Sequence, residues 1–314
     1  MDKALLKIGT RGSPLALKQV DLFEAALKAA HPDVAVERVI MKTSGDWKPA
    51  DGETRLSEKE GGKGLFVREI EQALADGAID CAVHSAKDVP SFLDDAFALD
   101  HVLSRANPYD AFICHEYGSF DELPEGAVVG TSSLRRQAFL LAIRPDLNIV
   151  PLRGNVQTRL EKIESGLAQA TFLAMAGLER LGLADAGFVH PLGADILLPA
   201  SGQGVIAIET RRDDLNSRAL LDAVHHKETG FCLAAERAAL QTLDGTCHTP
   251  IGAYAVLDAS GLTMELRLAI AYEDGRAIYR ETAKRAIHSI KEAESFGHEL
   301  ASLLKERSPS DILA

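Results

Sequence analysis

The chain has 314 residues, 46% of them hydrophobic and 25% charged, and a formal net charge of −12. This composition is ordinary for a globular protein and allows two or three domains. The acidic balance argues against nucleic acid or an anionic membrane as a partner, because both carry the same sign of charge. We see no signal peptide, and no run approaches the roughly 20 apolar residues of a membrane helix. We therefore expect a cytoplasmic protein.

The four cysteines lie far apart in the sequence and have no metal-binding spacing. They are Cys81, Cys114, Cys232 and Cys247. Such usage is typical of a reduced, cytoplasmic chain. The sequence predicts no metal site.

Strand-like and helix-like segments alternate over the first two hundred residues. The expected strands are 5–8, 34–41, 79–84, 128–129, 148–152 and 171–174, and the expected helices are 14–30, 65–76, 134–143 and 156–165. Ser13 is a good N-cap, and Pro14 suits the first helical position. The alternation is typical of βαβ units in a mostly parallel sheet. The polar stretch 43–62 is long for a connection, so we interpret it as a lid.

The last ninety residues have a different pattern. Three strand-like runs, 251–257, 262–272 and 276–285, are joined by two short turns with glycine, which predicts an antiparallel sheet. A helix from residue 230 to about 243 precedes the strands, and a helix over 290–307 closes the chain. This pattern predicts an α+β module.

Four glycine-containing turns each carry a cation near the start of an expected helix. These cations are Arg11, Lys63, Arg135 and Arg153. The free N–H groups of a helix N-terminus attract anions, and positive charge is disfavoured there. Ligands of such sheets bind beyond the carboxyl ends of the strands. The four turns therefore predict a site for a multiply charged anion.

Several of these polar residues also have a simpler interpretation. Arg135 and Arg136 could be a solvated pair on an exposed helix face, although planar guanidinium groups suit carboxylates and phosphates. Arg159 could pair with Glu161 or Glu164 on its own helix instead of binding a ligand. Ser13 caps a helix whatever else it does.

Two further residues are candidates for the chemistry itself. Asp88 follows an expected buried strand, where it is either a turn residue or a lone carboxylate among cations that stabilises positive charge or moves a proton. Cys247 lies in a polar turn beside His248, a setting that favours exposure and a thiolate. His84 is interpreted as a packing residue at the strand end.

Seven segments, taken in order, resemble the hydroxymethylbilane synthase family, also called the porphobilinogen deaminases. The resemblance covers essentially the whole chain, and its motifs are long and specific. The matching segments are 10–17, 61–66, 82–90, 130–136, 152–156, 198–204 and 245–247.

The resemblance implies a transferase that joins four porphobilinogen molecules head to tail, releases ammonia at each step and then releases the linear tetrapyrrole hydroxymethylbilane. The family builds this product on a dipyrromethane cofactor, which a thioether would attach to Cys247. Asp88 would stabilise the cationic azafulvene that forms as ammonia leaves. Each substrate carries an acetate and a propionate, so a growing product needs many cations. The family also suggests a monomer.

The resemblance assigns the remaining site residues by position. Residues expected to hold the cofactor are Ser13, Lys87, Asp88, Thr131, Ser132, Ser133, Arg135, Arg136, Arg153 and Gly154. Residues expected to bind substrate are Arg11, Ser13, Lys63, Phe66, Arg153, Arg159 and Gln203. Lys59 is assigned only weakly to the lid.

The implied fold has two related, periplasmic-binding-protein-like α/β domains around a cleft and a C-terminal α+β domain with a three-stranded antiparallel sheet. Domain 1 would comprise residues 1–103 and 204–224, domain 2 residues 104–203, and domain 3 residues 225–314. One departure is the cofactor turn, where Thr246 replaces a glycine of the familiar pattern. A threonine is stiffer, so the loop backbone could differ, but the nucleophile is kept.

Two rival hypotheses share parts of this evidence. A bilobal anion-binding module without catalysis would use the same cation turns. A cysteine-dependent acyl transferase would use Cys247 and His248. Neither explains the ordered match of seven motifs.

Overall fold

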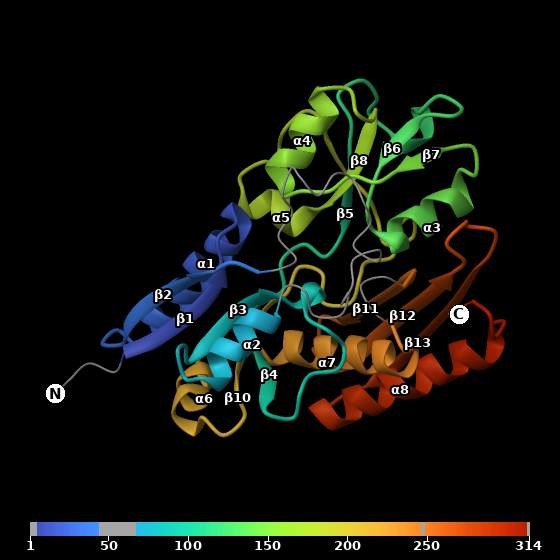
Figure 1. Ribbon diagram of the computed structural model, residues 1–314. Helices are drawn as coiled ribbons and strands as arrows, with labels where there is room; N and C mark the ends of the chain where they lie inside the picture. Colours follow the sequence, from blue (N-terminus) through green and yellow to red (C-terminus); the bar gives the residue numbers. More distant parts are fainter. Residues whose placement is uncertain (1–4, 44–66, 246–248, 313–314) are drawn as a thin grey trace.

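Three β-sheets organise the part of the chain that the computed structural model describes, which is residues 5–43, 67–245 and 249–312. Two sheets have five strands each, and the third has three (Figure 1). The expected fold class, two α/β units followed by an α+β unit with a three-stranded antiparallel sheet, is confirmed. Among the described residues, no helix combines the length and apolar character needed to cross a membrane.

The first sheet has the strand order β2-β1-β3-β10-β4, and β10 alone runs against the other four. Its strands are β1 (Leu5–Arg11), β2 (Ala35–Met41), β3 (Cys81–Ser85), β4 (Phe97–Val102) and β10 (Ile206–Arg211). Helices α1 (Pro14–Ala30), α2 (Arg68–Ala75) and α6 (Leu215–Asp222) belong to this unit. Val20, Phe23 and Leu27 recur at helical spacing on α1 and are fully buried, so this face packs on the sheet.

The second sheet repeats this arrangement in the order β7-β6-β8-β5-β9, with β5 as the reversed strand. Its strands are β5 (Asp110–Ile113), β6 (Val128–Gly130), β7 (Asn148–Val150), β8 (Ala170–Ala174) and β9 (Val189–Pro191). Helices α3 (Leu134–Ile143), α4 (Val156–Glu164) and α5 (Met175–Arg180) complete it. In each sheet the reversed strand adjoins a segment that links the two sheets. The two units are therefore built alike, as expected.

Two linking segments run beside each other between these sheets. The first lies between β4 and β5, and the second lies between β9 and β10. The amide of Ala106 donates to the carbonyl of Gly204 at 3.1 Å, and the guanidinium of Arg105 donates to the carbonyl of Gln203 at 2.9 Å. The position of the second sheet relative to the first is thus fixed by paired backbone.

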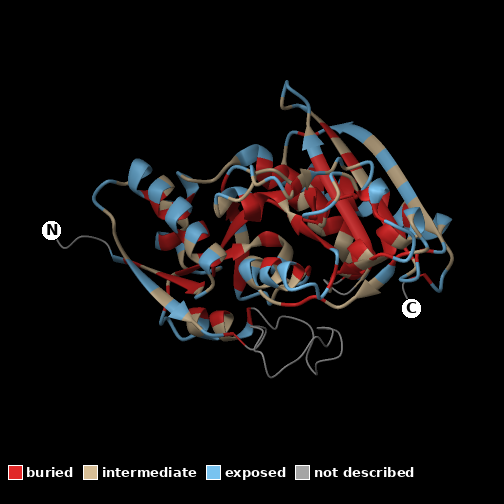
Figure 2. Ribbon diagram, turned by 90° about the horizontal axis from the view of Figure 1, so that it is seen from above, coloured by how far each residue is buried: buried red, intermediate tan, exposed pale blue. Residues whose placement is uncertain are grey.

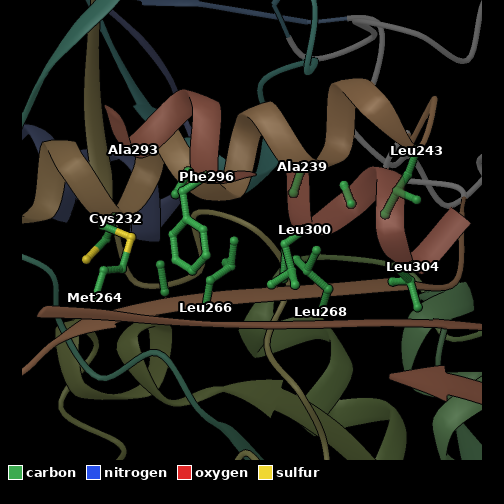
Figure 3. Close-up of a cluster of buried hydrophobic side chains, with 14 of the residues drawn as sticks. Cys232, Ala239, Leu243, Met264, Leu266, Leu268, Ala293, Phe296, Leu300 and Leu304 are labelled. Carbon is green, nitrogen blue, oxygen red and sulfur yellow. The ribbon is translucent and has the colours of Figure 1, made fainter. Parts of the chain in front are cut away.

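The third unit packs two helices on its antiparallel sheet. It comprises α7 (Lys227–Thr242), β11 (Ile251–Leu257), β12 (Thr263–Ala271), β13 (Ile278–Ala286) and α8 (Ile290–Arg307). Leu266 and Leu268 of β12 and Phe296 and Leu300 of α8 point into one buried cluster (Figure 3). Burial of each such side chain contributes about 1.5–3 kcal/mol to the free energy of folding. This core therefore holds α7 in place. Figure 2 shows buried residues along the inner strands of the sheets and on the helices that cover them, while β2 and β13 are intermediate or exposed.

Most expected elements are present, and several bounds agree to the residue, including those of α3 and α8. Other bounds need correction: β1 continues to Arg11, and α2 begins at Arg68 rather than residue 65. Helix α7 begins at Lys227 rather than residue 230, and β13 begins at Ile278 rather than residue 276. The sequence did not predict β4, β5, β9, α5 or α6. The expected lid, 43–62, lies almost entirely outside the described residues.

Candidate active site

The carboxyl ends of β1 and β3 open onto one small pocket. Arg11 ends β1 and Ser13 follows it, and Asp88 ends the short 3₁₀ turn that follows β3; all three line the pocket. Asp88 is exposed there, while Arg11 is half-buried. The sequence therefore brings a carboxylate and a guanidinium together although they lie far apart along the chain, as binding beyond parallel strands requires.

Ser13 and Gln19 shape the wall of this pocket. The hydroxyl of Ser13 accepts a hydrogen bond from the amide of Ala16 at 3.3 Å, so the predicted capping role is confirmed. The amide of Gln19 donates to the hydroxyl of Ser85 at 2.7 Å. Sequence reasoning missed Gln19, although a glutamine on the apolar face of α1 was a signal.

His84 also lines the pocket, and it lies against a buried carboxylate. Its Nε2 atom lies 2.9 Å from Oε2 of Glu209, and both side chains are almost completely buried. The interpretation of His84 as an ordinary packing residue is therefore incomplete. Glu209, an acidic residue within an apolar strand, was the signal that sequence reasoning passed over.

Arg135 and Arg136 are buried at the start of α3 and share one carboxylate, that of Asp110. Arg135 Nη2 lies 2.7 Å and Arg136 Nη2 2.6 Å from its two oxygens. The same guanidinium groups donate to the carbonyls of Leu198 and Phe172, each at 2.6 Å. The solvated-pair interpretation of these arginines is wrong, because both are only 5% exposed.

Asp110 remains ionised within this cluster. Burial by itself would raise the pKa of its carboxyl, but the charges of Arg135 and Arg136 outweigh burial and hold it well below its usual range. Two cations share one carboxylate, so the cluster of Arg135, Arg136 and Asp110 carries a net positive charge. Asp110 was not predicted, although a charged residue heading the apolar run of β5 was a signal.

Lys87 and Gln203 connect the pocket with this cluster. The ammonium of Lys87 donates to Gln203 Oε1 at 3.3 Å, and Gln203 Nε2 donates to Asp110 Oδ1 at 3.2 Å. Burial lowers the pKa of Lys87 to about 8; the charge of Asp88 opposes the shift, while those of Arg136 and Arg135 add to it. Lys87 therefore stays largely charged at neutral pH and would gain from an added anion.

The turns after β6 and β7 supply the other predicted residues. Thr131, Ser132 and Ser133 use their hydroxyls as acceptors for the amides of Ser133, Leu152 and Arg136 respectively. Arg153 is buried, and Arg159 donates to the carbonyl of Gly154 at 2.8 Å.

The lysine and arginine side chains of this region suit a ligand with several carboxylates, such as a dipyrromethane. Within the described chain, Nε of Arg135 is buried and has no hydrogen-bond partner, so one donor at the centre of the cluster awaits an acceptor. Lys87 is half-buried, and Arg136 and Arg153 are buried, each shortly after a strand or at the start of a helix. The described residues contain no group of His, Cys, Asp or Glu that could hold a metal ion.

Three predicted residues, Lys63, Phe66 and Cys247, lie outside the described residues, as does Lys59. The remaining cysteines are buried. Burial raises the pKa of the Cys81 thiol, and it raises that of Cys232 to about 12. Such thiols are poor nucleophiles near neutral pH.

Fold and site together define a bilobal α/β protein with a cationic site between its two sheets and an attached α+β unit. Two family models match it: "porphobilinogen deaminase, dipyromethane cofactor binding domain" over residues 6–219, and "porphobilinogen deaminase, C-terminal domain" over residues 230–306. The chain belongs to the porphobilinogen deaminase family, as its motifs predicted.

Two relatives agree with this assignment, and two solved structures share a weak likeness of fold. The porphobilinogen deaminase of Nitrobacter winogradskyi is 48% identical, and that of Nitrobacter hamburgensis 47%; each alignment covers 97% of this chain and 94% of the relative. The Bordetella pertussis BvgS periplasmic VFT2 domain is 15% identical, with a TM-score of 0.41 over 71% of this chain and 87% of its own. The regulatory domain of OxyR from Pseudomonas aeruginosa is 13% identical, with a TM-score of 0.41 over 71% and 98%.

Proposed function

We propose that this chain is a hydroxymethylbilane synthase in which Asp88 carries the chemistry. It joins four porphobilinogen molecules head to tail, releases ammonia at each addition and hydrolyses the finished linear tetrapyrrole from its cofactor. The observation that carries this assignment is the placement of Asp88: an exposed carboxylate at the end of β3, in one pocket with Arg11 and Ser13 and next to Lys87.

Asp88 suits a reaction that passes through a cation. Loss of ammonia from porphobilinogen leaves positive charge on the pyrrole, and a fixed carboxylate stabilises that charge more strongly in a water-poor site than in water. Arg11 lines the same pocket, and Lys87 directly precedes Asp88 in the chain.

The cationic residues bind the carboxylates of the cofactor and the substrates. The dipyrromethane, attached to Cys247, supplies the free pyrrole carbon on which each new unit is added. Lys87, Arg135, Arg136 and Arg153 would hold its acetate and propionate groups, together with Ser13, Asp88, Gly154 and the hydroxyls of residues 131–133. Arg11, Ser13, Lys63, Phe66, Arg153, Arg159 and Gln203 would bind incoming substrate.

The wider setting of this enzyme is also part of the proposal. We assign residues 1–103 with 204–224 to the first domain, 104–203 to the second and 225–314 to the third. The enzyme works as a monomer in the cytoplasm and binds no nucleic acid, in keeping with its net charge of −12.

The substitution Asp88→Asn tests the assigned role. It keeps the size of the side chain but removes the negative charge, so turnover of porphobilinogen should fall by at least about 100-fold, within the range that one electrostatic contact contributes. The melting temperature should change little, because Asp88 is exposed. Asp94→Asn, which alters another exposed aspartate a few residues away, should keep normal turnover. Full activity of the Asp88→Asn protein would refute the assignment.

A further inference from the structure

The segment that follows Asp88 is held by helix α7 of the third unit. Arg237 donates from Nη2 to the carbonyls of Pro90 and Ser91, at 2.7 and 3.2 Å, and from Nη1 to that of Val89, at 3.5 Å. Three successive carbonyls therefore face one guanidinium. This arrangement fixes the backbone one to three residues beyond Asp88.

Gln241 extends this contact along the same face of α7. It lies four residues after Arg237, so the two side chains share a face of the helix. Its Nε2 donates to the carbonyl of Ser91 at 2.8 Å, which is the carbonyl that Arg237 also contacts. Two side chains from one rigid helix thus converge on a single peptide group.

Ser91 also contacts Gly245, the last described residue before Cys247. The turn that contains Cys247 is called the cofactor-bearing loop below, because the proposed function attaches the cofactor there. The hydroxyl of Ser91 donates to the carbonyl of Gly245 at 3.0 Å, and the contact is buried. The amide of Gly245 in turn donates to the carbonyl of Leu240 in α7 at 2.8 Å. Gly245 precedes Cys247 by two residues, so its position limits where the chain that carries this thiol begins.

Helix α7 is itself held at both its start and its middle. The amide of its N-cap residue, His226, donates to the carbonyl of Val102 in β4 at 2.8 Å. Glu236 accepts a hydrogen bond from Arg105 at 2.6 Å in the linking segment. The helix also packs on α8 through the buried cluster of Figure 3. A shift of α7 would therefore disturb many contacts. The helix can thus fix the position of the segment 89–91 relative to Gly245.

We infer that Arg237, Gln241 and Ser91 are positioning residues that hold the catalytic Asp88 turn in register with the cofactor-bearing loop. None of them contacts the pocket itself, so each acts through the backbone that it holds. The inference rests on the proposed function, because it takes Asp88 as the catalytic carboxylate and Cys247 as the anchor. A misplacement of about 1 Å between such groups can lower a rate about 100-fold.

The central experiment compares Arg237→Gln with Arg211→Gln in the full chain. Arg211 is a matched control, because its guanidinium also donates to two backbone carbonyls, those of Leu74 and Ile79, each at 2.8 Å, but at the other end of the first sheet. Intact mass gives the fraction of each protein that carries the adduct. The kcat and KM for porphobilinogen are then measured per mole of that fraction.

The inference predicts a loss confined to kcat. Arg237→Gln should lower kcat about 10- to 100-fold and leave KM within about twofold of wild type, because the carboxylate-binding residues are untouched. Arg211→Gln should keep kcat even where it lowers the melting temperature as much. A folded Arg237→Gln protein without the adduct, beside an Arg211→Gln protein that carries it, would also support the inference. Equal kcat values for the two variants would overturn it, and so would a rise in KM with an unchanged kcat.

A second pair of variants covers the case in which Arg237→Gln does not fold. Ser91→Ala removes the hydroxyl that reaches Gly245, and Ser91→Thr retains one, so kcat should fall in the first and recover in the second. Equal kcat in both, with an active wild type, would overturn the positioning role alone. A wild type that neither carries the adduct nor consumes porphobilinogen would refute the proposed function itself.

Discussion

Asp110 joins the two arginines of α3 to the linking segments between the sheets. Its oxygens accept hydrogen bonds from Arg135, Arg136 and Gln203, and its side chain is completely buried. A buried pair of this kind rarely adds much stability in itself, but breaking it leaves an uncompensated charge. Here the carboxylate orients two guanidinium groups. Because it neutralises only one of their two charges, one positive charge remains for a ligand.

Replacing Asp110 should therefore be costly. Asp110→Asn leaves two buried arginines without their carboxylate, and we expect the free energy of unfolding in urea to fall by about 3–5 kcal/mol. Asp146→Asn removes the partner of Arg144 from a more accessible ion pair and should have a much smaller effect. An Asp110→Asn protein as stable as the wild type would contradict this account of the cluster.

The same group should make the protein sensitive to acid. The pKa of Asp110 is lower in the folded chain than the ordinary value of about 3.9, so its stabilisation is complete above about pH 4 and disappears as the pH falls below it. The free energy of unfolding should decline less steeply below about pH 4 in Asp110→Asn than in the wild type. Urea titrations between pH 5 and 2 measure both slopes.

The predictability of these residues depends on how far apart the partners lie. Ser13 and Ser133 could be predicted as helix caps, because each binds an amide three residues further on. The partners of Asp110 lie 25, 26 and 93 residues away, so no local pattern shows them. The family could be predicted from motifs, whereas the internal pairing that orients the arginines could not.

At the scale of elements, the two linking segments approach each other closely at Gly204. This residue has a φ of +87°, and a Cβ atom there would lie 2.6 Å from the carbonyl oxygen of Ala106. Gly126 has a similar φ of +74° but open space around it. The two glycines therefore separate the cost of an unusual backbone angle from the cost of a steric clash.

Alanine substitutions at these positions should differ in their effect. Gly126→Ala should lower the free energy of unfolding by about 1–2 kcal/mol, the cost of a left-handed conformation for a residue with a side chain. Gly204→Ala should cost more and should also reduce turnover, because the linking segments carry Gln203. Thermal unfolding and porphobilinogen consumption measure the two effects. Equal losses of stability would show that the close approach does not matter.

Long elements with strong local patterns were predictable, and short ones were not. Helix α8 combines a serine cap with a regular apolar face, and its expected range agrees with the observed one. Strands β5 and β9 have four and three residues, too few to show an alternation. Their strand conformation depends on partners elsewhere in the second sheet, so it becomes evident only in the assembled fold.

At the scale of the whole molecule, an acidic protein keeps several of its cations buried or half-buried near the strand ends. The net charge of −12 keeps the molecule apart from other anions, while Arg135, Arg136, Arg153 and Lys87 lie in buried or half-buried places near the strand ends. Repulsion at the surface and attraction in the site together favour small anionic substrates over large ones. A cofactor held covalently fits this arrangement, because it cannot be lost between additions.

Intact mass under denaturing conditions tests the central claim, that Cys247 anchors a dipyrromethane. The purified chain should exceed its calculated mass by two linked pyrrole units, and the excess should be absent from Cys247→Ser but present in Cys232→Ser, whose thiol is buried. An apo preparation should gain the excess on incubation with porphobilinogen. A wild-type chain that keeps its bare mass after that incubation would contradict the synthase account and leave a reversible anion-binding protein in its place.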